Sequence, residues 1–415
     1  MTAEVAILNT HGVALAADSA VTVSAGGEKK VYNTANKLFT LSKYHPVGIM
    51  IYNNATYMGI DWEIIIKEFR KTLNKEKCDS LFEYADKFIE YVKKYHYISD
   101  EEQEKDTLLS ICQNIILHIF NFFVKETRRK LKQNTNITLE QVVQLLDPTI
   151  KDIQEQQKNM KNEASYSLDI HFVVQHRTEI YQIIDKIFGK IKTTDNQKGD
   201  ILKIIKTDIK KGCNLSIFSG IVIAGYGDKE IFPSIYKCEI CGHIGKSFVL
   251  FKEGKEYISP KNRALMIPFA QKEMVQTFMS GIDPELNNII DERLENFMAS
   301  LSDIIGSSYK SKLMEAKDKF IENLSDIQRM FYIHPVMDIV ESLQKTDLAE
   351  MAETLVNLTA FKRHISKDAE TVGGPTDVAV ITKGDGFVWI KRKHYFDIKL
   401  NQSFQHNYFM EDINE

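Results

Sequence analysis

The distribution of strand-like and helix-like segments along the chain constrains its fold most. Strand-like stretches with a period near two lie in residues 1–72, 211–282 and 365–400, although the first range ends in a helical stretch, "ATYMGIDWEIIIKEFRKTL", and the second in another, "PFAQKEMVQTFMSGI". Residues 75–210 and 285–360 have helical spacing. A period of two is typical of strands, and recurrence every three to four residues is typical of amphipathic helices. Because strands and helices are segregated and do not alternate as βαβ units, the sequence predicts an α+β fold or a layered α/β sandwich. We expect one domain over residues 1–415, built from the strand segments, with the helical blocks as insertions.

Composition narrows the class of protein. The 415 residues are 43% hydrophobic and 27% charged, with a formal net charge of −4. These values are typical of a globular chain and give no electrostatic reason to expect nucleic acid as a partner. No apolar run approaches the roughly 20 residues of a membrane span, and the five cysteines are an odd, scattered set. We therefore expect a cytoplasmic protein without membrane association.

The first residues carry the most specific signal. Thr2 follows the initiator methionine, and its small side chain permits removal of Met1. The segment "TAEVAILNTHGVALAADSAVT" resembles the start of proteasome β-type subunits and their bacterial relatives, which are N-terminal nucleophile hydrolases. The match runs without a gap from Thr2 to Asp18, and "ANKLFTLS" supplies a lysine, Lys37. Near the C-terminus, "ETVGGPTDVAVITKGDGFVWI" resembles a Gly-Gly element of the same family.

The resemblance implies a four-layer αββα sandwich and a threonine-type hydrolase that cleaves amide or peptide bonds once Met1 is removed. A threonine hydroxyl needs a nearby base, and the free α-amine of an N-terminal threonine can accept its proton. Thr2 would be the nucleophile, Lys37 would lower the pKa of the amine and hydroxyl, and Asp18 would hold Lys37. No cofactor and no metal are required. The substrate would be a peptide or a small amide.

Supporting residues are expected by the same resemblance. Backbone N–H groups at Asn53 or Asn54 would stabilise the oxyanion, since asparagine tolerates positive φ. A carboxylate, from Asp368 or Glu370, and the hydroxyl of Thr371 would contact the amine of Thr2. Gly373 and Gly374 would let the backbone pass close to the nucleophile.

Other interpretations stay open at this point. The chain could be an inactive proteasome-like scaffold or assembly protein that uses its helical insertions to bind partners. Asp18 and Lys37 could then be a purely structural ion pair. Cys238, Cys241 and His243 would make only part of a four-ligand zinc site, so a reduced structural pair is the favoured interpretation. Relatives assemble into rings, which predicts a homo-oligomer.

Overall fold

The computed structural model describes residues 2–25, 28–94, 101–133, 139–164, 169–245, 247–366 and 372–403. It is a mixed α+β structure with antiparallel sheets and many helices, and the α+β class predicted from the sequence is therefore confirmed.

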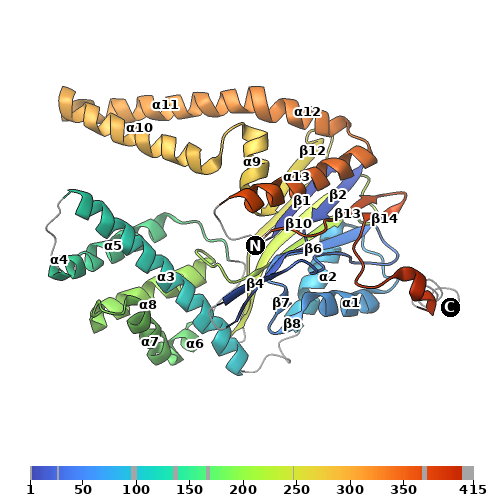
Figure 1. Ribbon diagram of the computed structural model, residues 1–415, viewed down its shortest axis with the longest axis horizontal. Coiled ribbons are helices and arrows are strands. Elements are labelled where there is room, and N and C mark those ends of the chain that lie inside the picture. The colour runs from blue at the N-terminus through green and yellow to red at the C-terminus, as the bar shows by residue number, and fades with distance from the viewer. Residues whose placement is uncertain are drawn as a thin grey trace.

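Two five-stranded antiparallel sheets occupy the centre of the molecule (Figure 1). The first sheet has, in spatial order, β12 (Ala264–Ala270), β1 (Ala3–Asn9), β2 (Gly12–Ala17), β13 (Asp377–Thr382) and β14 (Gly386–Lys391). The second has β11 (Ser247–Tyr257), β10 (Ser234–Ile244), β9 (Ser219–Gly225), β6 (Val47–Asn53) and β5 (Leu38–Thr40). Two small hairpins join β3 (Val21–Ala25) to β4 (Glu28–Tyr32) and β7 (Thr56–Tyr57) to β8 (Ile60–Asp61).

Strand β1 has one face toward the second sheet and one toward helices. Leu8 lies in a buried apolar cluster with Val222 of β9, whereas Ile7 lies in a cluster with Val356 of α13 (Lys345–Ile365). Successive residues of a strand point to opposite faces. The even-numbered residues of β1 therefore point into the space between the two sheets.

The outer face of the second sheet is also covered by helices. Trp62 of α1 (Trp62–Leu73) and Phe88 of α2 (Leu81–Lys93) share a buried cluster with Ile221 of β9. Asp61 caps α1 by accepting a hydrogen bond from the backbone N–H of Glu63. Buried apolar clusters thus join residues of the two large sheets to one another, and join strands of each sheet to helices.

The middle of the chain forms a helical block whose buried core also includes residues of β10 and β11, among them Ile244 and Phe251. A cluster of buried residues from α3, α5, α7 and α8 includes Ile115, Ile150, Ile184 and Ile205. The helices are α3 (Glu101–Gln133), α4 (Leu139–Gln144), α5 (Leu146–Asn159), α6 (Ile170–Gln175), α7 (Arg177–Phe188) and α8 (Asp195–Lys211).

Helix α3 departs from the expectation that no segment is long and apolar enough for a membrane span. Its residues Glu101–Lys130 have a window of mean hydropathy 1.6, which is enough by length and composition. The core helix of a soluble protein passes the same test, and 39% of that window is buried. Ile111, Ile115, Ile119 and Phe123 of α3 lie in the buried core of the helical block, which accounts for the apolar composition of this helix.

The second helical block runs from α9 to α13. It contains α9 (Glu273–Ser280), α10 (Pro284–Ile305), η2 (Ser307–Tyr309), α11 (Lys310–Gln328), the π-helix η3 (Arg329–Ile333), α12 (His334–Ser342) and α13. A short helix, η4 (Ile398–Leu400), follows β14. Helices α10 and α11 lie side by side and project away from the sheets as an arm (Figure 1). Asp283 caps α10 by accepting from two backbone N–H groups, with Pro284 in the first turn.

Candidate active site

Thr2 lies at the start of β1 and is buried, with 2% of its surface exposed. Its carbonyl oxygen accepts a hydrogen bond from the backbone N–H of Gln271 (3.1 Å), directly after β12. Its Oγ1 accepts a hydrogen bond from Nζ of Lys37 (3.0 Å). Hydrogen bonds therefore hold both the carbonyl group and the side-chain hydroxyl of Thr2 in place.

Lys37 directs its amine into this cluster. The residue precedes β5, and its carbonyl accepts from the N–H of Ile51 in β6 (2.9 Å). Besides Thr2, Nζ donates to Oδ1 of Asp18 (2.6 Å) and to the carbonyl oxygen of Ala20 (2.5 Å). An ammonium has three N–H donors, and all three have acceptors. Because one of them donates to Oγ1 of Thr2, the hydroxyl proton of Thr2 must point toward another acceptor.

Asp18 holds the site together through four hydrogen bonds to its carboxylate. Oδ1 accepts from Lys37 and from the backbone N–H of Ala3 (3.1 Å). Oδ2 accepts from the N–H groups of Ala20 (3.3 Å) and Gly373 (3.0 Å). These bonds help to explain why "VALAADSAVTV" is not one strand, since β2 ends at Ala17 and β3 begins at Val21. Asp18 joins the first strand, the lysine and a segment 355 residues away.

The C-terminal residues expected near Thr2 are only partly described. Gly373 contacts Asp18 as above, and its carbonyl accepts from the N–H of Ser19 (3.1 Å). Gly374 has φ of 77°, and a Cβ there would lie 2.8 Å from the Cβ of Asn33, so only glycine fits without displacement. Asp368, Glu370 and Thr371 lie outside the described residues.

A small cavity opens at Thr2. It has a volume of about 70 Å³, and its lining includes Thr2, Lys37, Asn53 and Asn54. Asn53 has a φ of 70°, and its side-chain amide donates to the carbonyl oxygens of Ser216 and Phe218. These hydrogen bonds fix the Asn53 side chain at the end of β6, and both Asn53 and Asn54 line the cavity.

Glu4 is a site residue that the sequence reasoning missed. It is 1% exposed, and it shares the inward face of β1 with Leu8. Neither carboxylate oxygen has a hydrogen-bond partner. Burial raises the pKa of Glu4 well above its ordinary value, the charge of Lys37 lowers it and that of Asp18 raises it further. Burial therefore favours the neutral form of the Glu4 carboxyl group, which lies close enough to Lys37 and Asp18 to feel their charges. Its one signal in the sequence is a single acid in the apolar strand "AEVAILN".

The three candidate zinc ligands lie on β10 in different surroundings. Cys238 belongs to the apolar cluster below α1, whereas Sγ of Cys241 lies 2.9 Å from the carbonyl oxygen of Ile217. Nδ1 of His243 is 2.9 Å from the hydroxyl of Tyr57. Within the described ranges no group of three or more His, Cys, Asp or Glu side chains is placed to hold a metal ion.

Comparison with known proteins identifies no family for this chain. No protein-family model matches it, and no curated protein does. Three solved structures are similar over nearly the whole chain. Anbu (ancestral beta-subunit) from Yersinia bercovieri has 8% identity and a TM-score of 0.28, covering 100% of this chain and 97% of that one. A Gly-1 mutant of Anbu from Hyphomicrobium sp. strain MC1 has 8% identity and a TM-score of 0.28, covering 100% and 98%.

The third structure is titled a helical assembly of the Anbu complex from Pseudomonas aeruginosa, with 9% identity, a TM-score of 0.27 and coverage of 99% and 95%. These matches correct the assignment to the proteasome β-subunits, because Anbu proteins are proteasome-like but form a distinct family. With TM-scores this low, the likeness carries no argument about the activity of this chain.

Proposed function

We propose that this protein is a threonine-type N-terminal nucleophile hydrolase that cleaves amide or peptide bonds after removal of Met1. The observation that carries the proposal is the chain of contacts from Asp18 through Lys37 to Oγ1 of Thr2, at the wall of a cavity. A buried ammonium directed at a hydroxyl favours the alkoxide-like character that attack requires.

The reaction follows from these positions. Oγ1 attacks the substrate carbonyl carbon and its proton passes to the α-amine of Thr2, directly or through one water. Backbone N–H groups at Asn53 and Asn54 would stabilise the oxyanion. Collapse of the tetrahedral species breaks the C–N bond, and the protonated amine gives its proton to the departing amine. Water then attacks the ester and loses a proton to the same amine. As the C–Oγ1 bond breaks, the amine returns that proton to Oγ1, which releases the acid and regenerates Thr2.

Asp18 and Lys37 act as positioning groups in this scheme. Lys37 is held by Asp18 and by the carbonyl of Ala20, so its third N–H has one direction left, toward Thr2.

The packing of the sheets supports the αββα sandwich as the finer description of the fold. In that arrangement the site lies between the sheets, at the end of β1.

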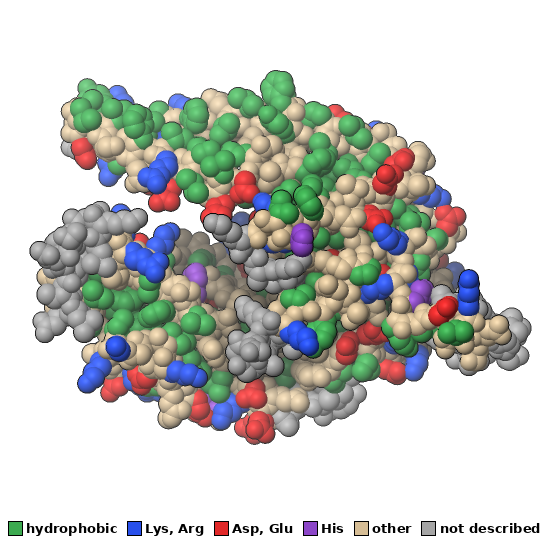
Figure 2. Space-filling view, in the orientation of Figure 1, with side chains coloured by type: hydrophobic (Ala, Val, Ile, Leu, Met, Phe, Trp, Pro, Cys, Tyr) green, Lys and Arg blue, Asp and Glu red, His purple; other side chains and the backbone are tan. Residues whose placement is uncertain are grey.

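We also propose that the chain self-associates through the arm of α10 and α11 and the adjoining helices. Sixteen large apolar side chains between Phe278 and Ile365 are exposed, whereas the only buried residues of α10 and α11 are Ser302 and Lys317. Figure 2 shows hydrophobic side chains along this arm. Half-exposed side chains of this number offer on the order of 1,000 Å² of apolar surface, above the ~800 Å² that each partner contributes to a stable dimer. A second copy carries the same surface, which suits a two-fold interface.

The rival function is an inactive scaffold that uses the same arm for assembly. Peptide hydrolysis by purified protein separates the two. Wild-type protein whose intact mass shows loss of Met1 is expected to cleave a mixed peptide library, whereas the Thr2→Ala variant should not. Thr2→Ser is the matched control, because it keeps a hydroxyl and should retain part of the activity. Equal residual cleavage by all three, or none by wild type lacking Met1, would leave the scaffold as the better description.

A further inference from the structure

Two larger cavities adjoin the one at Thr2. Their volumes are about 260 and 240 Å³, and both are lined by Asn36, Glu63, Lys67 and Arg392. Asn36 and Glu63 also line the cavity at Thr2. The three cavities therefore share walls, and an extended ligand bound at Thr2 can reach the other two.

The walls of these two cavities carry a net positive charge. We call the two cavities together the basic cleft. Glu63 and Asp377 are the carboxylates among the described residues that line it. Four cationic side chains line it as well, which leaves a net charge of +2; they are Lys67, Arg70, Arg392 and Lys393. An imbalance of this size in a concave surface favours an anionic ligand.

The two carboxylates are already occupied. Glu63 accepts from Lys67 (2.5 Å) and from the side-chain amide of Asn36 (3.1 Å). Partial burial would raise the pKa of Glu63, but these hydrogen bonds and the charges of Lys67 and Arg392 lower it, so the group is ionised. Asp377 forms an ion pair with Nζ of Lys393 and accepts from its backbone N–H (2.8 Å).

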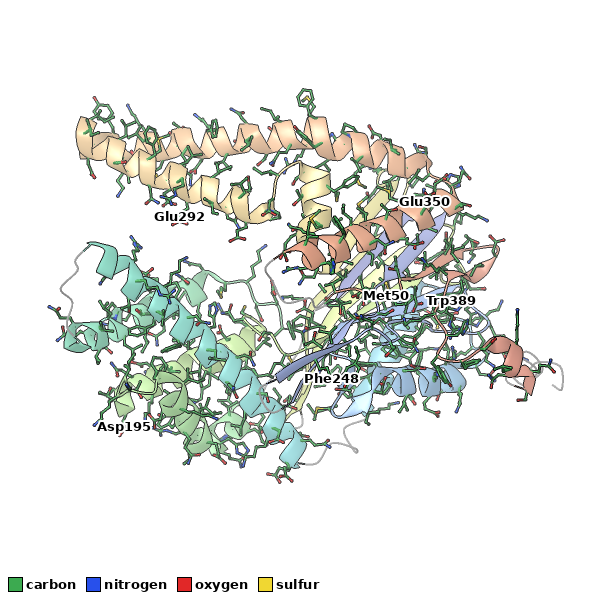
Figure 3. The ribbon with its side chains drawn as sticks, in the orientation of Figure 1. Met50, Asp195, Phe248, Glu292, Glu350 and Trp389 are labelled. Atoms are coloured by element: carbon green, nitrogen blue, oxygen red, sulfur yellow. The ribbon has the colours of Figure 1, made fainter. Side chains whose placement is uncertain are left out.

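Arg392 is the cation left to bind a ligand. Among the described residues it has no ion pair or hydrogen bond, and its guanidinium lies 4.7 Å from the ring centroid of Trp389, which Figure 3 labels on β14. The indole face supports the guanidinium plane while its N–H edges stay available. Beside it, burial and the charge of Arg392 lower the pKa of His394, so the histidine adds no competing positive charge at neutral pH.

We propose that the basic cleft binds an acidic side chain of a peptide substrate, with Arg392 as the main contact. The inference rests on the proposed function, because it places the scissile bond of the same peptide at Thr2. A planar guanidinium pairs with a carboxylate through two parallel hydrogen bonds, which the glutamine analogue of the substrate cannot match. The protein therefore prefers peptides with Asp or Glu at a fixed distance from the cleaved bond.

Binding to the Thr2→Ala variant tests the cleft without hydrolysis. Labelled peptides with Glu scanned through each position are compared with their Gln counterparts by fluorescence anisotropy. At one position, Glu is expected to bind about tenfold tighter at low salt, and the advantage should shrink as salt rises. Adding Arg392→Gln should remove the advantage, and Arg392→Lys should restore part of it.

Lys71→Gln is the matched control, because Lys71 lies on α1 but outside the cleft, paired with Glu68 and with 74% of its side chain exposed. It should leave the preference unchanged. Equal binding of Glu and Gln peptides at every position, or a preference that survives Arg392→Gln, would overturn the proposal. A preference that depends on Arg392, together with a wild-type protein lacking Met1 that cleaves no peptide, would retain the cleft and reject the hydrolase.

Discussion

Replacing Glu4 with glutamine should stabilise the protein, increasingly so as the pH rises. Glutamine has nearly the same volume as a neutral glutamic acid and stays uncharged at every pH. In the wild type, burial holds the pKa of Glu4 well above the ordinary value of 4.5. Between these two values the folded state keeps a proton that the unfolded state releases. The free energy of unfolding therefore decreases as the pH rises between these two pKa values, and Glu4 has no such effect below pH 4.5.

The magnitude follows from linkage. One bound proton of difference changes the free energy of unfolding by about 1.4 kcal/mol per pH unit. Wild-type stability should fall by this amount for each unit that the pH rises above about 4.5, until the raised pKa is reached. Glu4→Gln removes this contribution, so the difference between variant and wild type should widen by the same slope.

Urea unfolding at a series of pH values measures the effect, followed by tryptophan fluorescence. Trp62 is a suitable reporter because it is fully buried in the core beneath the second sheet. Glu315→Gln serves as the control, since the side chain of Glu315 is 66% exposed on α11, and it should change stability by no more than about 0.5 kcal/mol. Parallel pH profiles for wild type and Glu4→Gln would refute the assignment of a buried neutral acid.

Three further changes test the site and the arm. Lys37→Met removes the amine that contacts Thr2, so the rate of peptide hydrolysis should fall about 10²–10⁴-fold. It also leaves Asp18 buried without its cation, so the free energy of unfolding should fall by about 3–5 kcal/mol. Normal turnover with normal urea stability would contradict the role of Lys37. Asp18→Asn keeps the shape of the side chain but removes the charge that holds Lys37. The value of kcat should therefore fall at least tenfold, which corresponds to about 1.4 kcal/mol or more of activation free energy, while KM changes little. An effect on KM alone would argue against a positioning role. Phe297→Glu combined with Phe331→Glu adds charge to the apolar surface of the arm and its adjoining helix. It should shift the protein to a monomer in light scattering after size exclusion, whereas Lys71→Glu, an exposed control on α1 outside the arm, should not.

The sequence predicted the parts of the site that depend on short connections. One hairpin (β1 and β2) lies between Thr2 and Asp18, and a second (β3 and β4) lies between Asp18 and Lys37. The side chains of Thr2 and Asp18 lie within 3.0 Å of Nζ of Lys37. The resemblance implied that the backbone at Gly373 passes close to Thr2, but the hydrogen bond from Gly373 to Asp18 was not predicted, since periodicity gives no information across 355 residues. The α+β class likewise followed from segregated patterns, whereas the strand order did not. The pairing of β12 with β1 and of β13 with β2 is decided by packing between distant segments.

Other features could not be read from local patterns because they arise from tertiary packing. The orphan carboxyl of Glu4 is visible only once two sheets enclose it. Helix α3 contains a long apolar stretch because it lies in the buried core between the helical block and the strands β10 and β11, a context that composition alone does not provide. Arg392 and Lys67 come from opposite ends of the chain, and only the fold brings them into one cleft.

Covalent trapping of Thr2 tests the central claim most directly. A β-lactone or epoxyketone reagent reacts with an activated N-terminal threonine, and intact mass followed by peptide mapping locates the adduct. We predict a single adduct on Thr2 in wild-type protein that has lost Met1, and none in Thr2→Ala. An unlabelled wild type, retention of Met1 in cells, or an adduct that persists in Thr2→Ala would contradict the proposed nucleophile.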